Sequence, residues 1–87
     1  MLINTDRMAT QSLKDFLIAW ISLHLNKGLP VDPANTLATY GIDSIKAILL
    51  AEDTQNMFGF EWPPYLFFEE ISIAQLAAEG MNLMEER

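Results

Sequence analysis

Residues 41–59 read GIDSIKAILLAEDTQNMFG and carry the start and stop signals of one helix. Asp43 can cap the free N–H groups of a first turn, and Gly59 permits the left-handed turn that ends a helix. The stretch therefore predicts a helix from Ser44 to Phe58. We expect an apolar side made of Ile45, Ala47, Ile48, Leu49, Leu50 and Ala51. We expect Lys46, Glu52, Asp53, Gln55 and Asn56 to face water.

The segment before this helix predicts another helix. Thr10 or Ser12 can cap it, and its apolar residues continue to about Asn26. Gly28 and Pro30 then stop it. The helix is apolar around most of its circumference, so we expect it to be buried on several sides.

The segment after the central helix predicts two shorter elements. Residues 62–64 read Trp-Pro-Pro and break the chain, and residues 65–68 can form a single helical turn. Ser72 can cap a last helix that continues to about Leu83. Gly80 lies inside that helix, and its low helix propensity predicts a weak point there.

These elements predict an all-α fold, because no segment shows the alternating pattern of a strand. We expect a small helical bundle of three main helices plus one short helix, with a long loop at residues 27–40 between helices one and two. Such long loops are uncommon and tend to be functional. We assign residues 1–11 to a flexible N-terminal leader, residues 12–84 to the domain and residues 85–87 to a tail. The pattern favours a free-standing domain, and a domain excised from a longer protein stays open.

The composition excludes several functions. The chain has 87 residues, with 5 basic and 12 acidic side chains, so its net charge of −7 disfavours nucleic acid and anionic membranes as partners. It has no cysteine, which excludes disulfides and Cys-based metal sites. The longest apolar run, residues 16–21, is too short to cross a bilayer, and the N-terminus is no signal peptide. We therefore expect a cytoplasmic protein.

Ser44 is the residue with the most informative position. A nucleophilic serine needs a base within reach, and the only histidine, His24, lies in the predicted first helix. The chain has no Gly-x-Ser-x-Gly elbow, so we expect no catalytic role and no enzyme. A helix N-terminus does favour an attached phosphate, through its free N–H groups and its dipole. The alternative is that Asp43 and Ser44 form only an ordinary helix start.

The surroundings of Ser44 add a resemblance to a known family. Residues 37–48, LATYGIDSIKAI, resemble the attachment motif of acyl carrier proteins, whose core reads Gly-hydrophobic-Asp-Ser-hydrophobic. Residues 13–17 look like the start of the family's first helix, and residues 31–33 match a tripeptide that members often carry. Residues 63–68 and 71–77 resemble the third and fourth helices of polyketide and nonribosomal peptide carrier domains. The chain is thus similar to acyl and peptidyl carrier proteins, with motifs in the right order and spacing.

The resemblance implies a function. Ser44 would carry a covalent 4′-phosphopantetheine arm from coenzyme A, with Asp43 before it and Ile45 and Ile48 as apolar neighbours of the arm. The partners would be a phosphopantetheinyl transferase, which holds Mg²⁺ in its own site, an acyl- or aminoacyl-loading enzyme, and a ketosynthase or condensation enzyme. The chain would carry thioester intermediates as a monomer without a metal of its own.

The sequence departs from the family along the second helix. Members usually carry acidic residues there for docking, whereas this chain has Lys46 and Leu49 and places its acidic pair, Glu52 and Asp53, later. This favours polyketide or nonribosomal peptide biosynthesis over the fatty-acid type. Leu49, Glu52 and, if it is exposed, Trp20 are the candidate docking residues.

Two alternatives stay open at this point. One is a fatty-acid-type carrier, and the other is a helical protein-interaction module without a prosthetic group. The sequence does not name the cargo. Periodicity also does not assign the lining of a cargo pocket, for which Met57, Trp62 and Phe67 are candidates.

Overall fold

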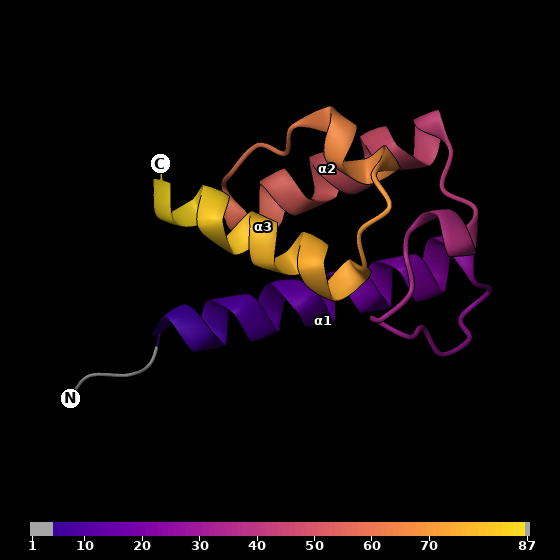
Figure 1. The fold of residues 1–87 in the computed structure, drawn as a ribbon, viewed down its shortest axis with the longest axis horizontal. Helices are drawn as coiled ribbons and strands as arrows, with labels where there is room; N and C mark the ends of the chain where they lie inside the picture. The colour runs from indigo at the N-terminus through magenta and orange to yellow at the C-terminus, as the bar shows by residue number, and fades with distance from the viewer. Residues whose placement is uncertain (1–4, 87) are drawn as a thin grey trace.

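The computed structural model confirms an all-helical fold (Figure 1). It describes the backbone of residues 5–86, and the side chains of residues 12–63 and 65–85. Within residues 5–86 there is no strand, and Thr36 and Ser72 form an isolated antiparallel bridge. The elements in chain order are α1 (Thr5–Leu25), the 3₁₀ helix η1 (Ala38–Tyr40), α2 (Ser44–Phe58), the 3₁₀ helix η2 (Pro64–Phe68) and α3 (Ile73–Glu86).

The outer ends of the first and last helices extend further than predicted. Helix α1 begins at Thr5, so the predicted start at Thr10 or Ser12 is wrong and residues 5–11 of the predicted leader are helical. No Gly or Pro lies between Thr5 and Ser12 to end the helix sooner. Helix α3 continues past the predicted end near residue 83 to Glu86. Residues 1–4 and 87 lie outside the described residues, and the domain limits 12–84 stay a prediction.

The caps of the other helix ends are as predicted. The Asp43 side chain accepts a 2.7 Å hydrogen bond from the backbone N–H of Lys46, in the first turn of α2. Gly59 ends α2 in the left-handed region, with φ 78°. Ser72 Oγ accepts from the Gln75 N–H at 3.0 Å, and the Gln75 side chain accepts from the Ser72 N–H at 2.9 Å. This reciprocal pair is a capping box, which fixes the start of α3.

The core lies where α1 and α3 pack side by side in opposite directions (Figure 1). Leu13, Leu17 and Ile21 of α1 are fully buried, as are Ile73 of α3 and Leu50 of α2. The rest of the core comes from Trp20, Leu37, Ala47, Phe60, Trp62, Leu66, Phe67, Leu76 and Ala77. The segment between α2 and α3 thus contributes four core residues, as many as α1 does.

Gly80 is a packing position, in addition to its predicted low helix propensity. A Cβ at this residue would lie 2.5 Å from Leu13 Cδ2 and 2.7 Å from Trp62 Cη2. Side chains at those distances overlap, so only glycine lets α3 approach α1 and the segment before η2 this closely.

The long loop between α1 and α2 is held against the start of α3. The backbone N–H groups of Ile73 and Ala74 donate to the carbonyl oxygens of Asn35 and Pro33, at 2.8 and 2.9 Å. These bonds satisfy N–H groups that the first turn of a helix leaves free. Within the loop, the Tyr40 hydroxyl accepts from the backbone N–H of residue 32 at 2.9 Å. The loop therefore places the turn before Ser44 relative to the rest of the bundle.

Candidate functional site

Ser44 is the first residue of α2, and its side chain is exposed. The preceding turn ends at Gly41, whose φ of 76° is left-handed and whose N–H donates to the Ala38 carbonyl at 3.0 Å. The Asp43 carboxylate caps Lys46, and Ser44 Oγ has no hydrogen-bond partner within the described part of the chain. Ser44 therefore presents a hydroxyl to solvent at the positive end of a helix, where a phosphate is electrostatically favoured.

A groove of about 340 Å³ begins at Ser44 and follows α2. One wall is a single stripe of α2 with helical spacing, and the other wall comes from Trp62 and from the end of η2. The lining residues are Ser44, Ala47, Ile48, Ala51, Glu52, Gln55, Trp62, Phe67 and Phe68. From Ser44 to Gln55 the stripe spans about 16 Å, at about 1.5 Å per residue. A group tethered to Ser44 can thus lie along the groove without leaving the surface of α2.

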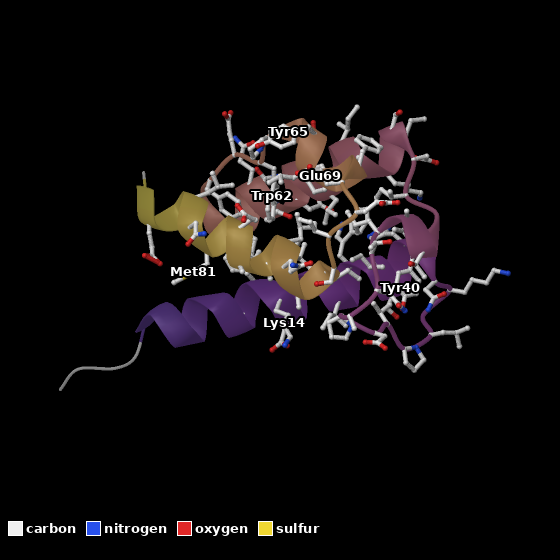
Figure 2. All side chains as sticks on the ribbon, viewed as in Figure 1. Lys14, Tyr40, Trp62, Tyr65, Glu69 and Met81 are labelled. Atoms are coloured by element: carbon white, nitrogen blue, oxygen red, sulfur yellow. The ribbon has the colours of Figure 1, made fainter. Side chains whose placement is uncertain are left out.

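The aromatic wall of this groove was only partly foreseen from the sequence. Trp62 and Phe67 line it, whereas Met57 is 64% exposed and does not. Trp62 lies in the interior, while Tyr65 is on the outer side of η2 (Figure 2). The Trp62 Nε1 is buried and has no hydrogen-bond partner among the side chains of residues 12–63 and 65–85 or the backbone of residues 5–86. The spacing of residues 62–68 gave no signal for this arrangement, because the segment has no regular period.

Helix α2 exposes part of its predicted apolar side. Its buried residues are Ala47, Leu50 and Thr54, whereas Ile45 and Ile48 are 70% and 59% exposed. The apolar side of α2 is therefore only partly buried. The cause is that only a narrow stripe of α2 meets the core, with Thr54 satisfied by a 2.7 Å hydrogen bond to the Leu50 carbonyl.

The residues predicted to lie beside the arm, Ile45 and Ile48, take different positions relative to the groove. Ile48 lines the groove. Ile45 is exposed outside the groove lining, so any contact with a tethered group would be made near the attachment point. Leu49 is 39% exposed and Glu52 is exposed, and both lie on α2 with Ser44. Their role in docking stays a prediction.

Trp20 is a core residue, which corrects its place among the docking candidates. Its side chain is 5% exposed, and its Nε1 donates to Asp53 Oδ2 of α2 at 2.7 Å. The exposed His24 packs on the same indole, with ring centroids 4.3 Å apart. The pattern Leu13, Leu17, Trp20 and Ile21 is the signal for this burial, since these positions share one helix face.

The described residues contain neither a metal cluster nor a membrane span. Among residues 12–63 and 65–85, whose side chains are described, no group of three or more His, Cys, Asp or Glu side chains could hold a metal ion. The described helices also include none that is long and apolar enough to cross a bilayer.

The chain is similar to known proteins over a region that contains Ser44 and the groove. A family model for the phosphopantetheine attachment site matches residues 18–79. The chain is also 32% identical over 76 residues to the non-reducing polyketide synthase dpmpA of Macrophomina phaseolina (strain MS6), an alignment that covers 84% of this chain. It spans only 3% of the length of that relative. No solved structure matches the chain.

The matched residues include α2, the groove and most of the core. Proteins of this family are carriers without catalytic activity of their own, and they hold 4′-phosphopantetheine covalently. The phosphopantetheine-attachment match covers most of the chain and all of the site just described, and on that basis the chain belongs to the acyl and peptidyl carrier-protein family.

Proposed function

We propose that the chain carries acyl intermediates of polyketide biosynthesis as thioesters on a 4′-phosphopantetheine arm attached to Ser44. The observation that carries the proposal is the position of Ser44. It is an exposed and unbonded hydroxyl at the capped N-terminus of α2, inside the matched region. The same role serves a free-standing carrier and a carrier domain within a longer polypeptide.

The residues around Ser44 suit a phosphodiester. Asp43 fixes the first turn of α2 through the Lys46 N–H, so the helix N-terminus keeps its geometry when Ser44 is modified. The positive end of the helix stabilises the charge of the attached phosphate. The bound arm supplies a terminal thiol that holds the acyl group as a thioester. This chain contains no cysteine that could compete for that acyl group.

The polyketide assignment draws on two observations. One protein similar to this chain is a non-reducing polyketide synthase. The surface of α2 next to Ser44 is also apolar, with Ile45 and Ile48 exposed and Leu49 partly so. An apolar centre with Glu52 at its side fits a partner enzyme with an apolar patch and a basic rim. We infer that the loading enzyme and the ketosynthase dock there.

Intact mass spectrometry tests the attachment. The protein is incubated with coenzyme A, Mg²⁺ and a broad-specificity phosphopantetheinyl transferase. We expect the mass gain of one phosphopantetheinyl group, which Ser44→Ala abolishes while its circular dichroism stays unchanged. Ser12→Ala, at an exposed serine of α1, is the matched control and should be modified normally. A well-folded wild-type protein that gains no mass would leave the interaction-module alternative in place.

A further inference from the structure

The first turn of α2, which presents Ser44, lies beyond the part of the helix that packs on the core. The buried residues of α2 are Ala47, Leu50 and Thr54, whereas Ser44 and Ile45 are exposed. The position of Ser44 therefore depends also on the segment that enters the helix. That segment is short, because only residues 41–43 separate Ser44 from η1.

The turn that enters α2 is built on a glycine. Gly41 has φ 76°, and its N–H donates to the Ala38 carbonyl at 3.0 Å. Glycine adopts many other backbone conformations at little cost, so such a turn needs contacts on both sides to stay in one form. After the glycine, the partly buried Ile42 packs against the core. Before the glycine, the contacts are those of Tyr40.

Tyr40 connects this turn to the rest of the loop between α1 and α2. Its hydroxyl oxygen accepts from the backbone N–H of Asp32 at 2.9 Å and from Asn35 Nδ2 at 3.2 Å, and its ring packs against the core. Asn35 is itself fixed to α3, because its carbonyl accepts from the Ile73 N–H at 2.8 Å. A continuous series of contacts thus runs from the start of α3, through Asn35 and Tyr40, to the turn before Ser44.

We propose that the Tyr40 hydroxyl, bonded to Asn35 and to the Asp32 N–H, is a positioning group for attachment of the phosphopantetheine arm. It keeps the turn at residues 41–43 in the form that a phosphopantetheinyl transferase binds. The proposal rests on the proposed function, since Ser44 must be the attachment residue.

The transfer itself uses Ser44 and coenzyme A. Ser44 Oγ forms a bond to the phosphorus on the pantetheine side of coenzyme A, and the P–O bond within the pyrophosphate breaks. Adenosine bisphosphate leaves, and the proton of the hydroxyl passes to a base of the transferase. Tyr40 touches none of these atoms, so it acts only through the position of the turn.

A turn released from Tyr40 should be bound more weakly by the transferase and should react at the same rate once bound. If the enzyme binds one form of the turn, KM rises in inverse proportion to the population of that form, while kcat stays the same. The loss of one neutral hydrogen bond corresponds to a change in population of about three- to tenfold. A global loss of stability would leave KM unchanged as long as the protein stays folded.

Steady-state kinetics of a phosphopantetheinyl transferase on the intact chain test the proposal, with the modified protein measured by mass. Tyr40→Phe keeps the ring and removes the hydrogen-bond acceptor. We expect its KM to rise about three- to tenfold, with kcat within about twofold of the wild type. Asn35→Ala should raise KM too. The double variant should be no worse than Tyr40→Phe, because both substitutions break the same contact.

Asn26→Ala is the matched control. Asn26 Nδ2 also holds the loop, by donating to the carbonyl oxygens of Leu29 at 3.3 Å and of Pro30 at 3.0 Å, but it does so at the start of the loop, far along the chain from Ser44. This variant should keep the KM of the wild type. Circular dichroism and urea denaturation verify that every variant is folded under the assay conditions.

Hydrogen exchange measured by NMR gives a readout that does not depend on the transfer. In Tyr40→Phe the Gly41 amide should exchange faster than in the wild type, because the turn opens more often. The Ile73 amide should keep its rate, since its bond to the Asn35 carbonyl is untouched. Faster exchange at both amides would mean that the whole loop loosens, which contradicts a specific role of the hydroxyl.

The kinetic outcomes separate this proposal from the carrier function. If the wild type is modified and Tyr40→Phe has the same KM, the positioning role is refuted and the carrier function stands. The same conclusion follows if Tyr40→Phe lowers kcat alone, if Asn26→Ala raises KM as much, or if the effects of Tyr40→Phe and Asn35→Ala add. A folded wild-type protein that is never modified would remove both proposals.

Discussion

Trp20 Nε1 donates a 2.7 Å hydrogen bond to Asp53 Oδ2, which joins the C-terminal half of α1 to the C-terminal half of α2. The bond matters for function because it holds α2 in place, and α2 provides both Ser44 and one wall of the groove. Asp53 is exposed and Trp20 is buried, so the bond lies at the edge of the core. It ties the orientation of α2 to the larger packing unit of α1 and α3.

We predict that Asp53→Ala lowers the free energy of unfolding by about 1–2 kcal/mol, because it leaves the Trp20 N–H without its charged acceptor. Urea denaturation followed by circular dichroism measures the change. Glu52→Ala is the matched control, since it removes the same charge from the next residue and should change stability by less than about 0.5 kcal/mol. Equal effects of the two substitutions would mean that charge, and not the hydrogen bond, matters here.

Gly80→Ala should destabilise the protein even though alanine favours helices. The new Cβ would overlap Leu13 and Trp62, and overpacking of this kind costs about 1–3 kcal/mol. The gain in helix propensity is about 1 kcal/mol. Thermal melting should therefore show a lower Tm for Gly80→Ala, whereas Glu79→Ala at the adjacent exposed position should leave the Tm unchanged or slightly higher. A raised Tm for Gly80→Ala would contradict the packing role.

The sequence predicted those parts of the fold that depend on local chemistry. The caps by Asp43 and Ser72 and the end of α2 at Gly59 follow from bonds within one turn of the residue concerned. The proposal of Ser44 as the attachment residue rests on local spacing combined with a family resemblance. The long start of α1 was missed because Thr10 and Ser12 fit a cap as well as a helix interior.

The groove and the core contacts needed the tertiary structure. The two walls of the groove come from residues 44–55 and 62–68. Neither segment, taken alone, predicts that the two lie against each other. The burial of Trp20 was left open, because a helix apolar around most of its surface does not show which residues face outward. The packing role of Gly80 could not be predicted either, because its contact with Leu13 joins α3 to α1, which are far apart in the sequence.

Asp43 should contribute to stability through its cap. Asp43→Ala removes the acceptor for the Lys46 N–H and should cost about 1 kcal/mol, whereas Asp43→Asn keeps an acceptor and should stay within about 0.5 kcal/mol of the wild type. Urea denaturation distinguishes the two. If Asp43→Asn were as destabilised as Asp43→Ala, the contribution would depend on the negative charge at the helix N-terminus and not on the cap bond.

The last prediction concerns docking to partner enzymes. Leu49→Lys and Glu52→Lys change exposed or half-exposed residues of α2, so both variants should fold normally and should still accept the arm. We expect each to lower kcat/KM for loading by an acyltransferase about fivefold or more, as substitutions in the centre of an interface do. The effect of Glu52→Lys should shrink at high salt, because it acts through charge, whereas that of Leu49→Lys should persist.

Leu23→Lys provides the control for these variants. Leu23 is 70% exposed on α1, so this substitution adds the same charge to an apolar surface residue of another helix. Loading kinetics of the three variants should be compared on protein that carries the arm, as verified by mass. If Leu23→Lys impaired loading as much as Leu49→Lys, net charge would explain the effect. If neither α2 variant changed kcat/KM, partner enzymes would have to recognise a surface other than α2.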